Sequence, residues 1–498
     1  MSKHVGVSRR GFVGGLTGAG AMFAAGGVRV GTGFDPGKER MRFGVLADIH
    51  IATPAQQPYF ERALRKFDEW KVDGVVACGD LADYAMELEL QLLADTWFKV
   101  FPGGRGSDGR PVANLMHYGD HDMQDERYIN FKDAVAQWPD EKMRRDSVMF
   151  THDRKASWER CFKEEWSVIA VKEVKGYPFV LSHFTRGEPD NRLGDNVPGL
   201  DEAMAKLTPD PSKPVFYSQH RIPRDTACGS IVWGQDDGSV TKILSGYPNA
   251  VAFCGHCHMG GAYEKSIWQG AFTCVQVPSL RYCTTMQGRE NGYSLKDRPR
   301  VVPAHPSKCM RPLGSGKCHQ GLLCMVHDNA LVIRRWEFTH DKPVGPDWVV
   351  PLDSFSMPPE RRPFAFANRE KTVGVPDFAP GAKVKVSKPL KGKKRDKTEH
   401  MMTTVSFPPA PPTAEGYRAN DYEVSLEQLH GEVERVLLQK RVYSPGYHCG
   451  ADMDVQPVKC LFAADEIPPG WDLRFTVRPV NAFGKKGAPI SSKWRKFT

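Results

Sequence analysis

The chain from Met41 onward alternates short apolar runs with amphipathic segments. The apolar runs include MRFGVLADIH at 41–50, DGVVACGDLAD at 73–83 and NAVAFCGHCH at 249–258, and each of them ends in polar residues. The segment 56–70 places its large apolar side chains at helical spacing. Continuous apolar strands separated by helices predict an α/β fold whose sheet is buried on both faces.

Aspartate, histidine and glycine residues gather just past the C-terminal ends of these predicted strands. Open α/β sheets bind their ligands at that edge. A lone histidine after a strand carries little information, because a polar cap on the sheet edge explains it. Five such groups in order, each ending a predicted strand, indicate one functional site. They are Asp48-x-His50, Gly79-Asp80-x-x-Asp83, Gly119-Asp120-His121-Asp122, His220 and Gly255-His256-x-His258.

Carboxylates and imidazoles together suit first-row metal ions such as Mn, Fe, Zn or Co. The five groups supply more ligands than a single tetrahedral ion needs. A carboxylate can bridge two ions with its two oxygens, so a two-metal site is the economical interpretation. Two ions about 3.5–4 Å apart suit displacement at phosphorus.

The stretch AFCGHCH at 252–258 has three possible interpretations. CxxCH is a haem attachment site, CGHC has the spacing of a thiol–disulfide oxidoreductase, and GHxH offers two metal ligands. The haem interpretation does not explain the other strand-end residues. A dithiol motif is expected to open a helix near the start of a domain, whereas this stretch closes the series of strand-end motifs. We therefore expect His256 and His258 to carry the function, and Cys254 and Cys257 to be small buried packing residues.

The motif series resembles the calcineurin-like metallophosphoesterases, whose pattern is D-x-H, G-D-x-x-D, G-N-H-D/E, H and G-H-x-H. The resemblance covers residues 41–352 and implies a four-layer α/β/β/α sandwich. It also implies hydrolysis of a phosphate mono- or diester by a metal-bridging hydroxide at a dinuclear site. The ions would be divalent or trivalent, such as Mn, Fe, Zn or a mixture.

The resemblance also implies a role for each matching residue. One residue would bridge the two ions, three would complete each metal site, and two would serve catalysis. His121 would stand beside the substrate and Asp83 would orient it. By this correspondence Asp48, His50 and His258 bind the first metal, Asp80 bridges, and Asp120, His220 and His256 bind the second.

One position departs from the family pattern. The chain has Asp120 where the family has asparagine. A carboxylate adds a negative charge, so we expect tighter binding of the second metal and a weaker Lewis acid there. Three residues near the motifs have alternative interpretations. Arg221 is either a phosphate ligand or a surface arginine. His117 and His183 resemble histidines that cap a sheet edge or support a ligand from behind.

The sequence after residue 352 changes character. Residues 353–378 are rich in proline and lack periodicity, which predicts a linker or a packed wrap-around segment. Short β runs return from 379 to 498 and predict a small all-β sandwich. Its last part, CLFAADEIPPGWDLRFTVRPVNAFG, resembles the final strands of a fibronectin type III domain.

The N-terminus resembles a twin-arginine (Tat) export signal. Ser8-Arg9-Arg10-Gly11-Phe12 precedes a Gly- and Ala-rich apolar run, and the predicted signal peptide spans residues 1–33. The export signal predicts a periplasmic or secreted protein, and no other segment approaches transmembrane length. Twelve cysteines are compatible with export, and their pairing stays open, with Cys309, Cys318, Cys324, Cys449 and Cys460 as neighbours in sequence.

The charge pattern limits the expected partners. The net charge of +9 is modest for 498 residues, and the lysine-rich stretch 382–397 has no aromatic residues between its lysines. A solvated segment is favoured there over nucleic-acid binding. We expect a phosphate-ester substrate. Two roles are open for the C-terminal domain: contact with a polymer or surface, or packing against the catalytic domain. The alternative is a non-catalytic adhesion protein that keeps this scaffold and binds through its sandwich.

Overall fold

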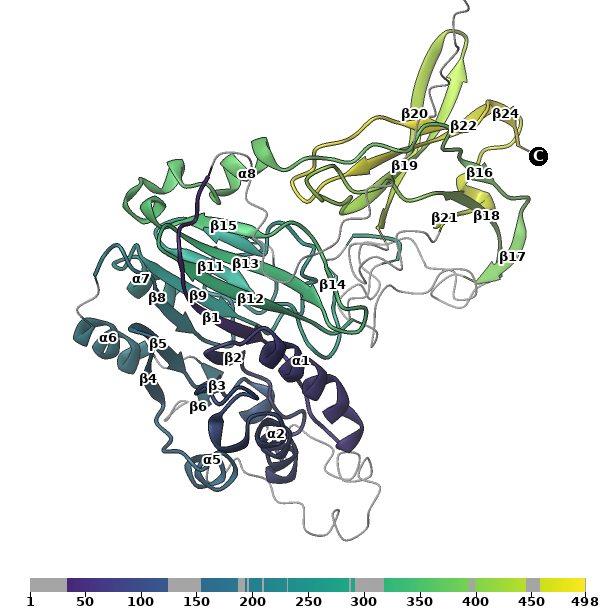
Figure 1. The fold of residues 1–498 in the computed structure, drawn as a ribbon. Helices are drawn as coiled ribbons and strands as arrows, with labels where there is room; N and C mark the ends of the chain where they lie inside the picture. Colours follow the sequence, from purple (N-terminus) through teal and green to yellow (C-terminus); the bar gives the residue numbers. More distant parts are fainter. Residues whose placement is uncertain are drawn as a thin grey trace, which may run out of the picture.

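The computed structural model describes residues 34–123, 154–186, 193–194, 197–207, 210–230, 232–285, 288–291, 318–393, 399–444 and 457–497. The predicted signal peptide, Cys309 and Cys449 lie outside these residues. None of the described helices combines the length and the apolar character that a membrane span requires. The chain folds into an α/β domain followed by a smaller all-β region (Figure 1).

The described part of the α/β domain contains two large sheets and the small two-stranded sheet of β6 (Thr185–Arg186) and β7 (Leu193–Gly194). The first has the order β14–β13–β12–β1–β2–β3, with β15 paired to β13, and the second has the order β10–β11–β9–β8–β5–β4. Strands β1, β2 and β3 run parallel, as do β5, β8, β9 and β11. The first sheet comprises β1 (Glu39–Leu46), β2 (Gly74–Cys78), β3 (Ala113–His117), β12 (Gln320–His327), β13 (Ala330–Glu337), β14 (Lys342–Pro343) and β15 (Trp348–Pro351). The second comprises β4 (Ile169–Val174), β5 (Tyr177–Ser182), β8 (Val215–Ser218), β9 (Ala250–Cys254), β10 (Ile267–Gln269) and β11 (Thr273–Gln276).

The two sheets pack face to face through large apolar side chains. The ring of Phe43 on the first sheet contacts Phe179, Phe216 and Phe253 on the second, at centroid distances of 5.1, 4.8 and 5.8 Å. All four rings are buried. Burial of a side chain of this size contributes about 1.5–3 kcal/mol, so this layer fixes how the sheets and their strand ends meet.

Helices cover the outer face of each sheet. Amphipathic α1 buries Phe60, Leu64 and Phe67 with α2 and α5 against the first sheet. Helices α6 and α7 cover the second sheet on the opposite side (Figure 1). The predicted four-layer α/β/β/α arrangement is therefore confirmed. The helices are α1 (Gln57–Glu69), α2 (Glu87–Val100), α5 (Arg154–Phe162), α6 (Val197–Lys206) and α7 (Ser239–Leu244).

The C-terminal sandwich consists of two antiparallel sheets around one core, as the short β runs predicted. One sheet has the order β16–β18–β17 with β21 on β18, and the other has β20–β19–β22–β23 with β24 on β22. Apolar side chains such as Tyr422, Phe462 and Phe475 fill the space between them. The strands are β16 (Lys385–Val386), β17 (Leu390–Lys393), β18 (Glu399–Phe407), β19 (Asp421–His430), β20 (Val433–Tyr443), β21 (Val458–Ala463), β22 (Asp472–Val480), β23 (Ile490–Ser491) and β24 (Arg495–Lys496).

The Pro-rich segment between the two parts packs against the α/β domain. It contains the short helix α8 (Phe366–Thr372). The Arg369 guanidinium pairs with the buried carboxylate of Glu264, which also accepts hydrogen bonds from Arg335 Nη1 at 2.8 Å and Trp348 Nε1 at 3.0 Å. A buried carboxylate that meets two guanidinium groups is well satisfied, so the segment is fixed where it crosses the domain.

Candidate metal centre

The strand ends of both sheets turn sharply at the predicted site. Asp48, His50, Asp80, His256 and His258 all have positive φ, between 48 and 69°. Non-glycine residues in this region are uncommon, and each costs about 1–2 kcal/mol. Strain of this kind gathers at functional sites, because the surrounding structure must hold it in place.

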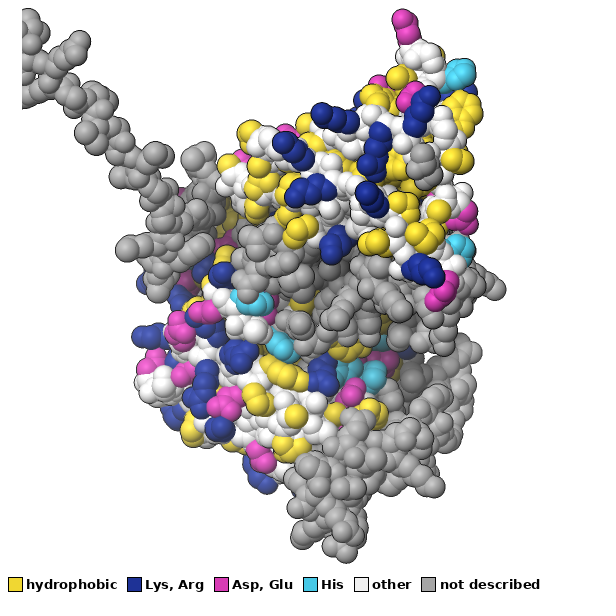
Figure 2. Space-filling view, turned by 90° about the vertical axis from the view of Figure 1, so that its right-hand side faces the viewer, with side chains coloured by type: hydrophobic (Ala, Val, Ile, Leu, Met, Phe, Trp, Pro, Cys, Tyr) yellow, Lys and Arg dark blue, Asp and Glu magenta, His cyan; other side chains and the backbone are white. Residues whose placement is uncertain are grey.

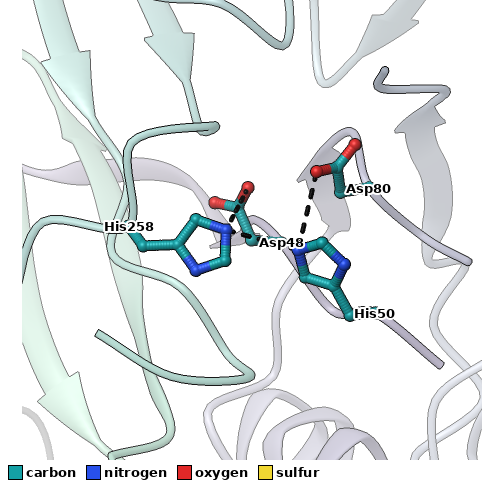
Figure 3. Close-up of side chains that lie close together, drawn as sticks. All are labelled: Asp48, His50, Asp80 and His258. Atoms are coloured by element: carbon teal, nitrogen blue, oxygen red, sulfur yellow. Dashed lines mark hydrogen bonds and ion pairs between the residues drawn. The ribbon is translucent and has the colours of Figure 1, made fainter. Parts of the chain in front are cut away.

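The first group of ligand atoms belongs to Asp48, His50, Asp80 and His258, and Figure 3 shows these side chains converging. His50 Nε2 lies 3.3 Å from His258 Nε2 and 3.5 Å from Asp80 Oδ2. His258 Nε2 lies 3.3 Å from Asp48 Oδ1. All four residues are buried, so their polar atoms meet in a space with little water.

The second group belongs to Asp80, Asp120, His220 and His256. His220 Nε2 lies 2.9 Å from Asp120 Oδ1, 3.2 Å from Asp80 Oδ1 and 3.1 Å from His256 Nδ1. His256 Nδ1 lies 3.3 Å from Asp120 Oδ1. Asp80 therefore belongs to both groups, with Oδ2 toward His50 and Oδ1 toward His220.

The histidines are oriented through their second ring nitrogen. The carbonyl oxygens of Tyr282 and Cys78 lie 3.0 Å from His258 Nδ1 and 2.8 Å from His220 Nδ1. A carbonyl accepts only from a protonated nitrogen, so each Nε2 keeps its lone pair for a cation in the neutral ring. This arrangement is typical of histidines that bind metal.

The donor set fits two metal ions. Imidazole nitrogens and carboxylate oxygens face one another at 2.9–3.5 Å in both groups, and two lone pairs at this separation need a proton or a metal ion between them. Asp48 Oδ2 is buried and has no hydrogen-bond partner among the described residues. A bound ion would supply one. Carboxylate and imidazole ligands suit several first-row metals and do not select one of them.

The acidic ligands are held in their ionised form. In the metal-free protein, burial opposes the charge of Asp48, but the charge and hydrogen bond of protonated His258 outweigh burial and lower the pKa of Asp48 to about 2. Burial also opposes ionisation of Asp120, and His256 with His220 lowers that pKa well below its usual range. Both side chains thus carry a negative charge at neutral pH, as metal ligands do.

His121 lies beside the two groups and is more exposed than any presumed ligand, with 36% of its side chain accessible. Its Nδ1 donates to the backbone carbonyl of Asp83 at 2.8 Å, and its backbone N–H donates to Asp80 Oδ1 at 2.9 Å. The Asp83 carboxylate lies 2.9 Å from His50 Nδ1 and 3.5 Å from His121 Nδ1. Asp83 therefore orients His121 with its carbonyl and His50 with its side chain.

Two further residues of the motif series determine how the loops pack: Asp122 joins two loops, and Gly255 allows a third to pass close to a ligand. Asp122 accepts backbone hydrogen bonds from Leu81 at 3.0 Å, Ala82 at 2.7 Å and Gly119 at 2.7 Å. It thus ties the loop after β2 to the loop after β3. A Cβ on Gly255 would lie 2.9 Å from Asp48 Oδ2, so only glycine fits where this loop passes the ligand.

Three other residues flank the ligands: two histidines that belong to neither group, and one arginine next to a ligand histidine in sequence. His117 and His183 belong to neither ligand group, and His117 is buried with its Nε2 2.7 Å from Ser218 Oγ. Arg221 lies over the ring of Phe184 at 5.0 Å, next to His220 in sequence. Its Nε is buried and has no hydrogen-bond partner among the described residues.

Two aromatic residues beside the ligands carried no sequence signal. The Tyr282 ring lies 4.3 Å from the ring of His258, and the Trp233 ring lies 5.0 Å from that of His256. Both come from loops without a recognisable motif or periodicity. Only the fold places them beside the metal centre.

Comparisons with known proteins gave one family match and a group of similar solved structures. Residues 41–260 match the family model for calcineurin-like phosphoesterases, whereas a search of curated proteins gave no match. Similar solved structures include a dimetal phosphatase from Danio rerio, with 10% identity, a TM-score of 0.39, and coverage of 63% of this chain and 100% of that one. GAP50, described as the anchor in the inner membrane complex of Plasmodium, has 10% identity, a TM-score of 0.33, and coverage of 61% and 87%. The purple acid phosphatase PPD1 from yellow lupin seeds has 11% identity, a TM-score of 0.34, and coverage of 64% and 55%.

The matched residues contain every presumed metal ligand, from Asp48 to His258. Strands β10 to β15 continue the same two sheets beyond the match. Residues 41–260 are therefore a calcineurin-like metallophosphoesterase domain, with a His and Asp cluster compatible with two metal ions.

Proposed function

We propose that this protein is a metal-dependent hydrolase of phosphate mono- or diesters. The observation that carries the proposal is the pair of ligand groups that share Asp80. A shared carboxylate keeps two ions close enough to act on one phosphate group. Figure 2 shows histidine and acidic side chains together at the surface of the α/β domain, with many lysines and arginines on the sandwich above them.

The proposed centre divides its ligands between two ions. Asp48, His50 and His258 would hold the first ion, and Asp120, His220 and His256 would hold the second. Asp80 belongs to both ligand groups. When bound, the two ions would offset the charge of the phosphate group and supply a water of lowered pKa as the nucleophile.

His121 is the proposed proton donor to the leaving-group oxygen. Its Nδ1 is fixed by the Asp83 carbonyl, which leaves Nε2 for the substrate. In the metal-free protein, burial opposes its charge, but Asp80 and Asp120 outweigh burial and raise its pKa to about 9. Cations bound to these carboxylates would offset part of that effect. A protonated imidazole with one fixed nitrogen is suited to general acid catalysis.

We also propose export by the twin-arginine pathway. The support is the sequence Ser8-Arg9-Arg10-Gly11-Phe12 before an apolar run. Replacement of Arg9 and Arg10 by lysine should retain the protein in the cytoplasm, as cell fractionation would show. Unchanged export of that variant would contradict the proposal.

Turnover of two chromogenic esters tests the proposed activity. Metal-free protein is reconstituted separately with Mn²⁺, Fe²⁺ and Zn²⁺ and assayed with p-nitrophenyl phosphate and bis-p-nitrophenyl phosphate. We expect at least one ion to restore turnover and the ratio of the two rates to separate monoesterase from diesterase. Full-length protein that binds no metal and cleaves neither ester would support the non-catalytic alternative.

A further inference from the structure

The C-terminal sandwich contacts a loop that leads back to the metal centre. Arg289 Nε pairs with Asp421 Oδ2 at 2.5 Å, at the start of β19. Asn291 Nδ2 donates to the Tyr443 carbonyl at 3.1 Å, and Asn291 Oδ1 accepts from the Tyr443 N–H at 2.7 Å. The backbone N–H of Glu290 donates to the Arg441 carbonyl at 2.8 Å. Residues 289–291 thus bond to the end of β20 much as a neighbouring strand would.

The same loop begins against the ligands. The N–H of Arg281 donates to the Asp48 carbonyl at 3.1 Å, and the Tyr282 carbonyl accepts from His258 Nδ1. The Thr284 N–H donates to the His258 carbonyl at 2.7 Å, and its hydroxyl donates to the Cys257 carbonyl at 2.7 Å. Residues 281–284 therefore fix both the backbone and the ring of His258.

A second contact approaches the ligand loop from behind. Tyr443 of the sandwich is 1% exposed and belongs to the apolar core of the α/β domain. That core also contains Tyr263, Cys228 and Cys257, and Cys257 stands between the two histidines of the G-H-x-H motif. The sandwich thus supports the ligand loop through a buried side chain as well as through the contacts of residues 281–284 and 289–291.

We propose that the C-terminal sandwich positions His258 of the metal centre, and that Asn291 and Tyr443 are its positioning residues. A loop anchored at both ends has fewer conformations than a loop anchored at one. Loss of the hydrogen bonds between Asn291 and Tyr443 would loosen residues 281–284. The Tyr282 carbonyl, which orients His258, lies among them. A ligand misplaced in this way binds metal less tightly. The role of His258 as a ligand rests on the proposed function, whereas the order of its loop does not.

The variant Asn291→Ala tests the proposal in the full-length protein. In metal-free protein we expect amide hydrogen exchange of Thr284 and thiol labelling of Cys257 to become at least tenfold faster. With Mn²⁺ or Zn²⁺ added, one of the two ions should bind at least tenfold more weakly. The kcat for p-nitrophenyl phosphate at subsaturating metal should fall, while KM stays within twofold.

The matched control is Leu473→Ala. Leu473 is buried in the sandwich core and pairs with Gln428, near the opposite end of β19 from Asp421. This variant should lower the melting temperature of the sandwich but leave Thr284 exchange, Cys257 labelling and metal binding as in the wild type.

As a second pair, Arg289→Gln should reproduce the Asn291→Ala effects in a milder form, and Arg289→Lys should restore the wild-type values.

Two results would overturn the proposal. The first is wild-type exchange, labelling and metal affinity in both Asn291→Ala and Arg289→Gln. The second is an equal change in Leu473→Ala, which would trace the effect to loss of overall stability. If the loop loosens as expected but the wild-type protein cleaves no phosphate ester, only the proposed function fails.

Discussion

At the scale of single residues, chemically similar groups of the candidate metal centre have different surroundings. Seven histidine and aspartate side chains form the two ligand groups, whereas His121 lies beside them and keeps a partly exposed ring. The motif pattern predicted these residue types because it specifies them directly. It did not predict that the carbonyl of Asp83, rather than its carboxylate, binds His121 Nδ1, because backbone direction at a strand end depends on the fold.

Replacement of His121 separates catalysis from metal binding. We expect His121→Gln to lower kcat about 10²- to 10⁴-fold, because the leaving group loses its proton donor. The metal content should stay at the wild-type value, since His121 belongs to neither four-residue ligand group. Steady-state kinetics and metal analysis of the same preparation check both statements. A variant with wild-type kcat would exclude His121 as the acid.

Replacement of Asp120 tests the departure from the family pattern. The Asp120→Asn variant keeps an oxygen ligand near His220 and His256 but removes one negative charge. We expect unchanged metal stoichiometry, weaker binding of one ion and an altered kcat. Titration of metal-free protein, followed by metal analysis, measures this. Loss of one ion from the variant at saturating metal would show that the second site requires the carboxylate.

At the scale of elements, the ends of β1, β2, β3, β8 and β9 bring the ligands together. Their order along the chain could be predicted, because apolar runs and helical spacing reveal parallel strands and parallel strands share one edge. The predicted helix at 56–70 agrees with α1 (Gln57–Glu69) for the same reason. The contributions of Tyr282 and Trp233 could not be predicted, because irregular loops have no period that sequence reveals.

The end of β9 shows which residues of AFCGHCH matter. Cys254 and Cys257 are fully buried free thiols in the described structure, and burial raises the pKa of each well above its usual value. They are therefore inert packing groups. Cysteine interpretations of this stretch fail because its thiols point into the core and its imidazoles point to the ligand groups.

Paired substitutions at this strand end check that conclusion. We expect the double variant Cys254→Ala with Cys257→Ala to keep kcat within a few-fold and to lose about 1–3 kcal/mol of stability. His256→Ala or His258→Ala should abolish turnover and weaken metal binding. Kinetics and thermal unfolding of the three proteins measure this. Loss of turnover in the correctly folded double-cysteine variant would show that the thiols are needed for activity.

At the scale of the whole molecule, the C-terminal sandwich is attached to the α/β domain by a buried interface. The hydrophobic pattern predicted its β character, because short alternating runs without helical spacing are typical of strands. That pattern did not predict the contacts of Arg289 with β19 and of Asn291 with β20. These contacts join residues more than a hundred positions apart, and local patterns carry no information on such pairs. The likeness to fibronectin type III domains stays a prediction.

Glu290 makes the stability of this interface depend on pH. Burial raises the pKa of Glu290 to about 7, although Lys440 partly offsets the effect. Because the folded pKa lies above the unfolded value, ionisation opposes folding, and stability falls as the pH rises from about 4.5 to 7. The loss amounts to roughly 3 kcal/mol at most.

The variant Glu290→Gln removes that dependence. Thermal unfolding of metal-free wild type and variant should coincide near pH 4.5, and at pH 8 the variant should melt at the higher temperature. Ligand carboxylates titrate alike in both proteins, so their difference reports Glu290 alone. A difference between the two melting temperatures that does not change with pH would contradict this assignment.

The number of metal ions per chain tests the central claim most directly. Wild-type protein saturated with Mn²⁺ or Zn²⁺ and freed of excess metal should contain two ions per chain. Asp80→Ala, which removes the carboxylate shared by both groups, should contain at most one ion and show no turnover of either p-nitrophenyl ester. One ion or none in the wild type, or two in Asp80→Ala, would contradict a dinuclear centre bridged by Asp80.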